Sequence, residues 1–453
     1  MSEHSLHAFT DSRLVGKLTH ESQDGRYSFQ YADAWKAGRD TFYLSPAIPL
    51  DHAPERPGTV QRFLENLLPE GRALDIVSIM SQVSKANTFA LINVLGKEPV
   101  GAFGFIAFDA SEEEAERIRQ EQQLQPERRP LPDEELSQRI RERDAIPFPV
   151  WDRKVRLSLA GYQDKLQVLV EGTQLSLADG SLSSTHLLKP ESFNPRMSFM
   201  VANEHYCMSL AARLGLPVAP VSIRRLPEAI LLIERFDRRV RWRDGLAEQV
   251  QRLHVIDACQ ALDLPRDFKY ERNLGAGEDV RNIREGVSFE KLFTLLDKMV
   301  TPATARPFLV RWALLQLMLG NSDAHGKNIS FFVSRAGLTP APMYDLVSVN
   351  VYGEDVEADM AMAYGDAFTL EEVSPFALAD FAHRTKTPPA TLAREITRMA
   401  DGIIRYAPVQ AAADIYVGEE RAHVQRISDF VCAQANRLRA MAGEVPKVAP
   451  NLL

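Results

Sequence analysis

The residues best suited to chemistry lie in one short segment, Gly320-Asn-Ser-Asp-Ala-His-Gly-Lys-Asn328. Asp323 and Asn328 are five positions apart in it, and Asp345 follows at the end of a short apolar run. Phosphoryl transfer needs a carboxylate that accepts the proton of the attacking hydroxyl, together with oxygen ligands for Mg²⁺. Kinase catalytic loops place an Asp and an Asn at this spacing for those tasks, with a second metal-binding Asp further on. The pattern therefore predicts Asp323 as a catalytic base and Asn328 and Asp345 as magnesium ligands.

Two other side chains belong to this hypothesis, and the segment also has a simpler explanation. Lys327 is expected to place a cation beside the phosphates, and His325 to contact the nucleotide or orient the loop. However, Asp and Asn in a glycine-rich loop are often only turn-forming residues. The helix before the segment, the strand after it and the later Asp345 add weight to the catalytic interpretation, and both explanations stay open at this point.

The elements that position this loop are predicted from the spacing of apolar residues. A helix is expected over 306–319, because apolar side chains recur there at helical spacing, at Phe308, Trp312, Leu315 and Leu319. Gly320 ends this helix, since glycine is favoured just beyond a helix C-terminus. A strand is expected over 329–333, so the chemical residues would lie on the loop between helix and strand.

A nucleotide site also needs a cation that holds the phosphates. Lys189 ends the predicted strand Thr185-His-Leu-Leu-Lys189 and meets that need. A partner carboxylate is expected on the next helix, and Glu204 lies early in the helix predicted over 202–214. The alternative for Glu204 is a carboxylate that the helix dipole favours near a helix N-terminus.

The loop expected to cover the phosphates is unusual. The Gly-x-Gly-x-x-Gly pattern of protein kinases is absent, and Leu157–Lys165 joins two predicted strands with a single glycine, Gly161. The backbone N–H groups of such a turn can still cradle phosphate. No His-Arg-Asp precedes Asp323, so a kinase of the ordinary eukaryotic type is disfavoured. The candidate nucleotide contacts of this loop are Ala160, Gly161, Tyr162, Gln163 and Lys165.

Composition limits the class of protein. A chain of 453 residues predicts two or three domains, and its net charge of −8 disfavours binding of DNA by this chain alone. The three cysteines are scattered without a Cys-x-x-Cys pair, which disfavours a structural zinc site and indicates reduced thiols. No signal-peptide core and no bilayer-spanning apolar stretch are apparent, so a cytoplasmic location is expected.

Shifts in composition divide the chain into five parts. They are an N-terminal α+β subdomain at 1–110, a charged and proline-rich linker with a short helix at 111–150, a β-rich nucleotide-binding lobe at 151–245, a helical catalytic lobe at 246–445 and a tail at 446–453. ATP is expected in the cleft between the β-rich and helical lobes.

Taken together, several segments resemble the HipA toxin kinase family over nearly the whole chain. The matching segments are Phe63–Glu70, Ser158–Lys165, His186–Pro190, Asn203–Cys207, Glu234–Arg238, Asn321–Asn328 and Pro342–Leu346. The resemblance implies an α+β, protein-kinase-like, two-lobed fold with a small N-terminal α+β subdomain and a mostly helical C-terminal lobe. It also implies an ATP- and Mg²⁺-dependent serine/threonine-protein kinase.

The resemblance further implies roles for individual residues. Asp323 would be the base, Asn328 and Asp345 would hold Mg²⁺, and Lys189 would bind the phosphates. Glu234 and Phe236 would line the adenine pocket through backbone groups. Ser158 would be the autophosphorylation site whose modification inactivates the kinase, because a doubly charged group beside the ATP phosphates is strongly repelled.

The family resemblance also carries expectations about partners. Its members act in toxin–antitoxin pairs with a small helix-turn-helix antitoxin (HipB-like), and reach operator DNA through that complex. Their targets include aminoacyl-tRNA synthetases. One departure is that many relatives have a polar Gln-Glu-Asp stretch where this chain has Val255-Ile256-Asp257. Any substrate contact of the two replaced side chains is therefore in doubt.

Three alternatives remain open from the sequence. The first is an inactive relative that acts as an interaction or co-repressor module. The second is a small-molecule kinase of similar fold. The third is a metal-dependent hydrolase using Asp323, His325 and Asp345, which is disfavoured because no histidine-rich ligand set accompanies them.

Overall fold

The computed structural model describes residues 3–95, 101–107, 111–123, 125–152, 154–155, 163–356 and 359–453. The chain divides into two compact units. The first unit comprises Met1–Pro190, Arg224–Ile256 and Phe331–Leu338, and the second comprises Glu191–Ile223, Asp257–Ser330 and Thr339–Leu453. The division falls within four strands, β11 (Val221–Arg225), β15 (Val255–Asp257), β16 (Ser330–Ser334) and β17 (Gly337–Pro340), of which the last three form a sheet in the order β15-β16-β17.

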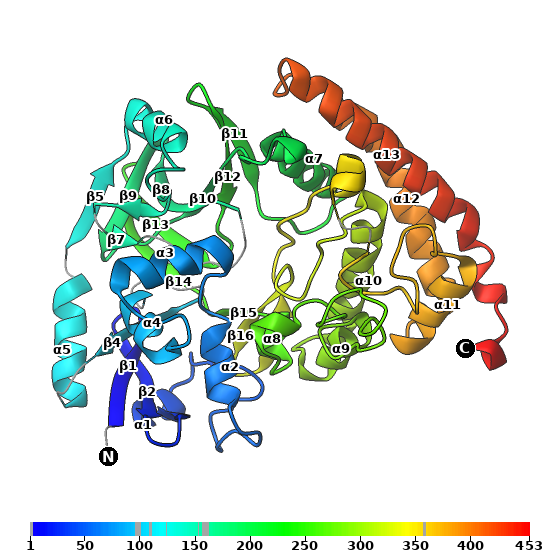
Figure 1. Cartoon of the computed structure of the whole chain (residues 1–453). Helices are drawn as coiled ribbons and strands as arrows, with labels where there is room; N and C mark the ends of the chain where they lie inside the picture. Colours follow the sequence, from blue (N-terminus) through cyan, green and yellow to red (C-terminus); the bar gives the residue numbers. More distant parts are fainter. Residues whose placement is uncertain are drawn as a thin grey trace. The chain divides into compact units, whose positions relative to one another are not determined.

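The first unit begins with a four-stranded antiparallel sheet of order β3-β2-β1-β4 (Figure 1). Its strands are β1 (Glu3–Thr10), β2 (Arg13–Glu21), β3 (Arg26–Tyr31) and β4 (Phe103–Ala107). Four helices lie between β3 and β4 in sequence: α1 (Asp33–Ala37), α2 (Thr59–Glu65), α3 (Gly71–Ser81) and α4 (Thr88–Leu95). Leu6, Ala8 and Phe9 on the interior strand β1 are fully buried, so this α+β part has its own core.

A second sheet has six strands in the order β11-β12-β10-β8-β9-β5. Besides β11, its strands are β5 (Pro126–Pro130), β8 (Leu166–Glu171), β9 (Gln174–Gly180), β10 (His186–Pro190) and β12 (Ala229–Glu234). Two smaller antiparallel pairs accompany it: β6 (Val150–Trp151) with β7 (Lys154–Val155), and β13 (Arg238–Arg243) with β14 (Leu246–Arg252).

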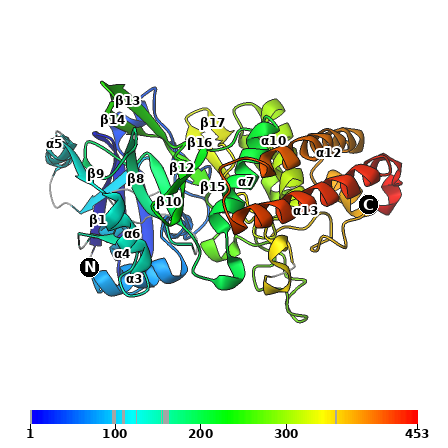
Figure 2. The same ribbon diagram turned by 90° about the horizontal axis from the view of Figure 1, so that it is seen from above.

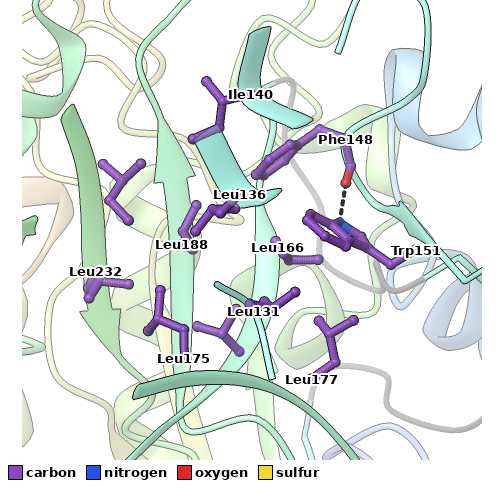
Figure 3. Packing of buried hydrophobic residues seen from close by; sticks show 12 residues of the cluster. Leu131, Leu136, Ile140, Phe148, Trp151, Leu166, Leu175, Leu177, Leu188 and Leu232 are labelled. Carbon is purple, nitrogen blue, oxygen red and sulfur yellow. Dashed lines mark hydrogen bonds between the residues drawn. The ribbon is translucent and has the colours of Figure 1, made fainter. Parts of the chain in front are cut away.

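The core of the six-stranded sheet corrects one expectation. Sequence analysis predicts a solvated linker over 111–150, but this segment forms α5 (Glu112–Gln123), β5 and α6 (Asp133–Arg141). Figure 3 shows its side chains packed with residues of β8, β10 and β12 in one hydrophobic cluster. The buried residues that the segment and its end contribute are Leu131, Leu136, Ile140, Phe148 and Trp151. The prediction is wrong because few apolar residues, spaced among charges and prolines, are enough to cover one sheet face.

The second unit is mainly helical. Figures 1 and 2 both show its two longest helices, α12 (Pro389–Ala411) and α13 (Glu419–Ala442), lying side by side. The other helices are α7 (Met200–Arg213), α8 (Ala258–Ala261), α9 (Phe289–Thr294), α10 (Pro302–Leu319) and α11 (Pro375–Arg384). Short 3₁₀ turns are η1 (Pro195–Met197), η2 (Arg266–Phe268), η3 (Leu295–Lys298), η4 (Asn350–Asp355), η5 (Val445–Lys447) and η6 (Pro450–Leu452).

Two general properties follow from the described residues. None of their helices is both long and apolar enough to cross a membrane. The three cysteines are free thiols, of which Cys207 and Cys259 are buried and Cys432 is partly exposed.

Candidate active site

The predicted catalytic loop starts where α10 ends. Leu317, Met318 and Leu319 are buried in the last turn, and Gly320 takes a left-handed conformation with φ 62° and ψ 41°. The Gly320 carbonyl accepts hydrogen bonds from the backbone N–H groups of Val349 and Asn350, each at 3.1 Å. A left-handed glycine is a common way to end a helix, and here it fixes the direction in which the loop leaves α10.

Asp323 lies on this loop with an exposed side chain. Its Oδ1 accepts a hydrogen bond of 2.6 Å from the hydroxyl of Tyr270. Its carbonyl accepts hydrogen bonds from the His325 N–H at 2.8 Å and from Nδ2 of Asn328 at 2.9 Å. The Asp323–Asn328 spacing is thus closed into a compact turn that holds the carboxylate toward solvent and orients the Asn328 amide.

The backbone before Asp345 is tied to the backbone before Asn328. The Tyr344 hydroxyl lies 2.7 Å from the Lys327 carbonyl, to which it donates, and 2.7 Å from Oγ of Ser330. Asp345 itself has a left-handed φ of 56°, which is uncommon for a residue other than glycine and occurs often at functional positions. The structure therefore brings the segments that carry the two predicted magnesium ligands together.

His325 is buried and acts on the loop itself. Burial and the nearby Lys269 and Lys327 cations lower the pKa of His325 to about 3, although the Asp345 charge opposes them. The imidazole is therefore neutral at physiological pH, and its Nδ1 accepts a hydrogen bond from the Lys327 N–H at 3.3 Å. Its ring meets the ring of Tyr270 edge to face, with centroids 5.0 Å apart. Of the two expected roles, these contacts support orientation of the loop.

Lys327 has a partner inside the second unit. Its Nζ donates to Oδ2 of Asp257 at 2.6 Å, and both side chains are almost entirely buried. Oδ1 of the same Asp257 accepts from the Gln260 N–H at 2.8 Å and begins α8 in a capping box. Lys327, expected beside the phosphates, thus joins the loop to the start of α8.

Helix α7 anchors the chain that follows Asp345. Asn203 bonds to the backbone of Ser348 twice, since its Nδ2 donates to the Ser348 carbonyl at 2.9 Å and its Oδ1 accepts from the Ser348 N–H at 2.8 Å. The neighbouring Glu204 is only 1% exposed. A glutamate is almost never this buried without a partner, so Glu204 belongs to the interior of the second unit.

The predicted phosphate lysine lies on a strand of the first unit. β10 pairs with β8 so that Leu187 lies opposite Gln167 and Leu188 opposite Leu166. Lys189 is the next residue of β10, and Lys165 directly precedes β8. Leu188 and Leu166 belong to the core of Figure 3, so side chains one position along point to the other face of the sheet.

Lys189 therefore points away from this core, and it is only 5% exposed. Lys165, directly before β8, is 8% exposed. A lysine on a strand is the kind of residue that holds nucleotide phosphates in kinases.

The predicted adenine-contacting segment begins at the last residue of β12, in the first unit. Glu234 is exposed, and the ring of Phe236 meets that of Phe332 edge to face at 5.9 Å. Between them, the buried Arg235 forms a two-point ion pair with Asp237, at 2.9 and 2.8 Å. The buried arginines beside it hold the pKa of Asp237 far below its usual range, although burial alone would raise it. The segment has a rigid backbone from which Glu234 and Phe236 project.

Some predicted residues lie outside the described part of the chain, namely Ser158, Ala160, Gly161 and Tyr162. Gln163 is described and is partly exposed. Val255 and Ile256, which replace a polar pair of many relatives, are 1% and 0% exposed. These two side chains are core residues, which explains their apolar character.

Sequence reasoning missed two contributors to the loop, Tyr270 and the ion-pair role of Asp257. Tyr270 precedes Asp323 by 53 residues, and Asp257 precedes Lys327 by 70. Neither belongs to a local pattern with the loop, so no spacing signal links them.

Comparison with known proteins gives consistent matches. Residues 157–407 match the HipA-like C-terminal domain, and residues 6–106 match the HipA N-terminal domain. The serine/threonine-protein kinase toxin HipA of Shewanella oneidensis is 41% identical over 85% of this chain and 84% of its own length. The Y4mE protein of Sinorhizobium fredii, whose name proposes a kinase, is 32% identical over 97% of this chain and 99% of its own.

A solved structure agrees with these relatives. The complex of HipA, HipB and operator DNA from Shewanella oneidensis matches with a TM-score of 0.85 and 37% identity, over 98% of this chain and all of that one. Fold and site thus define an α+β protein of the protein-kinase-like class. More particularly, the chain belongs to the HipA family and is a serine/threonine-protein kinase of that toxin type.

Proposed function

We propose that this kinase transfers the γ-phosphoryl group of ATP to a serine or threonine hydroxyl of a protein, with Asp323 as the catalytic base. The observation that carries the proposal is the geometry of the loop after α10. There an exposed aspartate is fixed by a hydrogen bond to its carboxylate and by two to its carbonyl. The residues before Asn328 and Asp345 are joined by the Tyr344 hydroxyl.

The proposed role of Asp323 is limited to accepting one proton and aligning the attacking hydroxyl. The attacking hydroxyl loses a proton as the new O–P bond forms and the bond to the β-phosphate oxygen breaks, releasing ADP. A positioned carboxylate accepts that proton and aligns the hydroxyl. The exposure of Asp323 suits it to meet a hydroxyl on another protein.

Asn328 and Asp345 are the residues that would hold Mg²⁺. Amide and carboxylate oxygens are the hard donors that Mg²⁺ prefers, with water and phosphate oxygens as its remaining ligands. When bound, the ion neutralises charge that develops on the phosphates. The Tyr344–Lys327 hydrogen bond and the Asn203–Ser348 pair would keep the two ligands in register.

The β-rich part, 151–245, would supply the nucleotide contacts, and 246–445 the catalytic groups. Lys189 and Lys165 would meet the phosphates, with Glu204 as a supporting carboxylate. Glu234 and Phe236 would contact the adenine from the segment that begins at the end of β12.

We assign Lys327 and His325 to holding the loop, because both have partners within it or at α8.

The loop of Ser158 to Lys165, with Ala160, Gly161, Tyr162 and Gln163, would cover the phosphates. Autophosphorylation of Ser158 would switch the kinase off, because the added charge opposes return of the loop to the ATP phosphates.

We also propose that the partner of this chain is a HipB-like helix-turn-helix antitoxin and that the chain contacts DNA through that complex. An aminoacyl-tRNA synthetase is a candidate target, and the proposed location is cytoplasmic. The net charge of −8 fits a chain that reaches DNA through a basic partner.

Calorimetric titration with ATP, with and without Mg²⁺, tests the nucleotide site. Lys189→Met is expected to weaken ATP binding at least about tenfold, since a phosphate ion pair is lost. Asn328→Ala should remove the gain in affinity that Mg²⁺ gives. Lys298→Met, an exposed lysine of η3, is the matched control and should bind as the wild type does. Absence of ATP binding to the wild type would contradict the proposal and favour an inactive interaction module.

A further inference from the structure

Tyr270 is a hydrogen-bond partner of the Asp323 carboxylate. Its hydroxyl donates to Oδ1 at 2.6 Å, a length typical of a strong bond from O–H to a charged oxygen. The tyrosine ring is half-buried and packs edge to face on His325. The Nζ of the buried Lys269 lies 5.4 Å from the ring centroid. Both ends of this side chain are therefore held by the catalytic loop or its immediate support.

The backbone around Tyr270 is fixed on both sides. The Lys269 carbonyl accepts from the Gly326 N–H at 2.8 Å, and the Glu271 N–H donates to the Ala361 carbonyl at 2.9 Å. Gly286 approaches so closely that a Cβ there would lie 1.7 Å from the Tyr270 carbonyl oxygen. A residue braced in this way cannot readily swing away from Asp323, so it is suited to positioning and poorly suited to gating.

We propose that Tyr270 is a positioning residue of the kinase, which orients the Asp323 carboxylate for the incoming hydroxyl through its hydrogen bond to Oδ1. This inference rests on the proposed role of Asp323 as the base. An ionised carboxylate has about four acceptor sites, so a hydrogen bond from Tyr270 can coexist with one from a substrate hydroxyl. Small errors in the position of a reacting group are costly, since a displacement of about 1 Å can lower a rate about 100-fold.

The discriminating variant is Tyr270→Phe, which removes the hydroxyl and keeps the ring that packs on His325. The measurement is the single-turnover rate at which radiolabelled Mg·ATP transfers phosphate to the protein itself and to proteins of a cell lysate. We expect this rate to fall about 10- to 100-fold, with the dissociation constant for Mg·ATP unchanged within about twofold. Tyr406→Phe is the matched control, because the described residues give its hydroxyl no hydrogen bond, and its rate should equal that of the wild type.

A spectroscopic measurement separates positioning from a general structural effect. In protein with isotope-labelled tyrosine ring carbons, the Tyr270 resonance is assigned by its loss in Tyr270→Phe. Asp323→Asn should shift this resonance and leave that of Tyr406 in place. A fall in nucleotide affinity equal to the fall in rate, or an unshifted Tyr270 resonance, would overturn the positioning role.

The outcomes also separate this inference from the proposed function. A wild-type rate in Tyr270→Phe, with Asp323→Asn inactive, would reject the role of Tyr270 and leave Asp323 as the base. A faster rate in Tyr270→Phe would show that the hydroxyl blocks the site, which also rejects positioning. A wild-type rate in Asp323→Asn would reject the proposed base, whatever Tyr270 does.

Discussion

At the scale of single residues, the loop depends on charges that are buried in pairs. Lys327 donates a 2.6 Å hydrogen bond to Asp257, and the two side chains are 4% and 11% exposed. Removing one partner of such a pair leaves the other charge buried without compensation, which costs more than the pair itself contributes. The pair therefore serves mainly to fix where the loop lies against α8.

Lys327→Met tests this view. We expect it to lower the free energy of unfolding by about 3–5 kcal/mol, because the Asp257 carboxylate stays buried. Asp257→Asn keeps a residue suited to begin α8 and removes the opposite charge. The double variant should be more stable than the sum of the two single effects predicts, by at least about 1 kcal/mol. Urea unfolding measures all three, and strict additivity would show that the two side chains do not stabilise each other.

A second prediction at this scale concerns His254. Burial lowers the pKa of His254 to about 4, although a hydrogen bond of 2.8 Å from its Nε2 to the Leu44 carbonyl opposes this. The unfolded chain, with a histidine pKa near 6.5, binds this proton more readily than the folded chain does. The stabilising contribution of neutral His254 is thus full above pH 6.5 and is lost as the pH falls from there toward 4.

His254→Gln keeps an N–H donor for Leu44 and removes the titration. Between pH 7.5 and pH 5, the wild type should lose about 2 kcal/mol more of its free energy of unfolding than the variant does. Urea unfolding at the two pH values provides the measurement. Equal losses in both proteins would mean that His254 is not held neutral by its surroundings.

The residues of the candidate site that lie near one another along the chain could be proposed from the sequence. The spacing of Asp323 and Asn328 and the later Asp345 follow from how a loop joins a helix to a strand, and the structure places their segments together. Tyr270 and Asp257 could not be predicted this way, because only tertiary folding brings them to the loop. The ion pair of Lys327 with Asp257 could not be predicted either, since no sequence pattern reveals that this charge has an internal partner.

At the scale of elements, close contacts of the backbone set the loop in place. Gly326 donates to the Lys269 carbonyl at 2.8 Å, and its own carbonyl accepts from the Ala258 N–H at 3.0 Å. A Cβ added at Gly326 would lie 2.5 Å from Cγ2 and 2.9 Å from Cβ of the fully buried Val287. This glycine is required because two segments pack against the catalytic loop at that point.

Gly326→Ala should therefore destabilise the chain by about 1–3 kcal/mol, the usual cost of overpacking a core. It should also slow phosphate transfer, because the turn between Asp323 and Asn328 is displaced. Gly277→Ala is the matched control, since its added Cβ would meet only Val280 at an ordinary 3.7 Å. Thermal unfolding and the transfer rate are measured for both variants, and a wild-type rate in Gly326→Ala would show that the loop has more room than the structure gives it.

Elements with strong periodicity or clear ends were predicted well, and weakly patterned ones were not. The helix expected over 306–319 is α10, which Gly320 ends, and the strand expected over 329–333 is β16. The segment 111–150 failed because charges and prolines dominate it, whereas Leu131, Leu136 and Ile140 are the residues that matter for packing. Its place in a sheet depends on partners elsewhere in the chain, which local composition does not reveal.

At the scale of the whole molecule, each unit carries its own share of the predicted residues. The first unit holds Lys165, Lys189 and the segment from Glu234 to Asp237, and the second holds the loop with Asp323, Asn328 and Asp345. The similarity to HipA of Shewanella oneidensis extends over 98% of the chain in the structural comparison. Both sets of residues therefore lie within the part of the chain that matches HipA. The proposed roles of both sets depend on whether this chain transfers phosphate from ATP.

The most direct test is to incubate the purified chain with Mg·ATP and to map phosphate by intact-protein and peptide mass spectrometry, beside Asp323→Ala. The account predicts one phosphate on Ser158 in the wild type and none in the variant. ATP that stays unconsumed, with no phosphate on the chain or on proteins of an added cell lysate, would contradict the claim that this loop catalyses phosphoryl transfer.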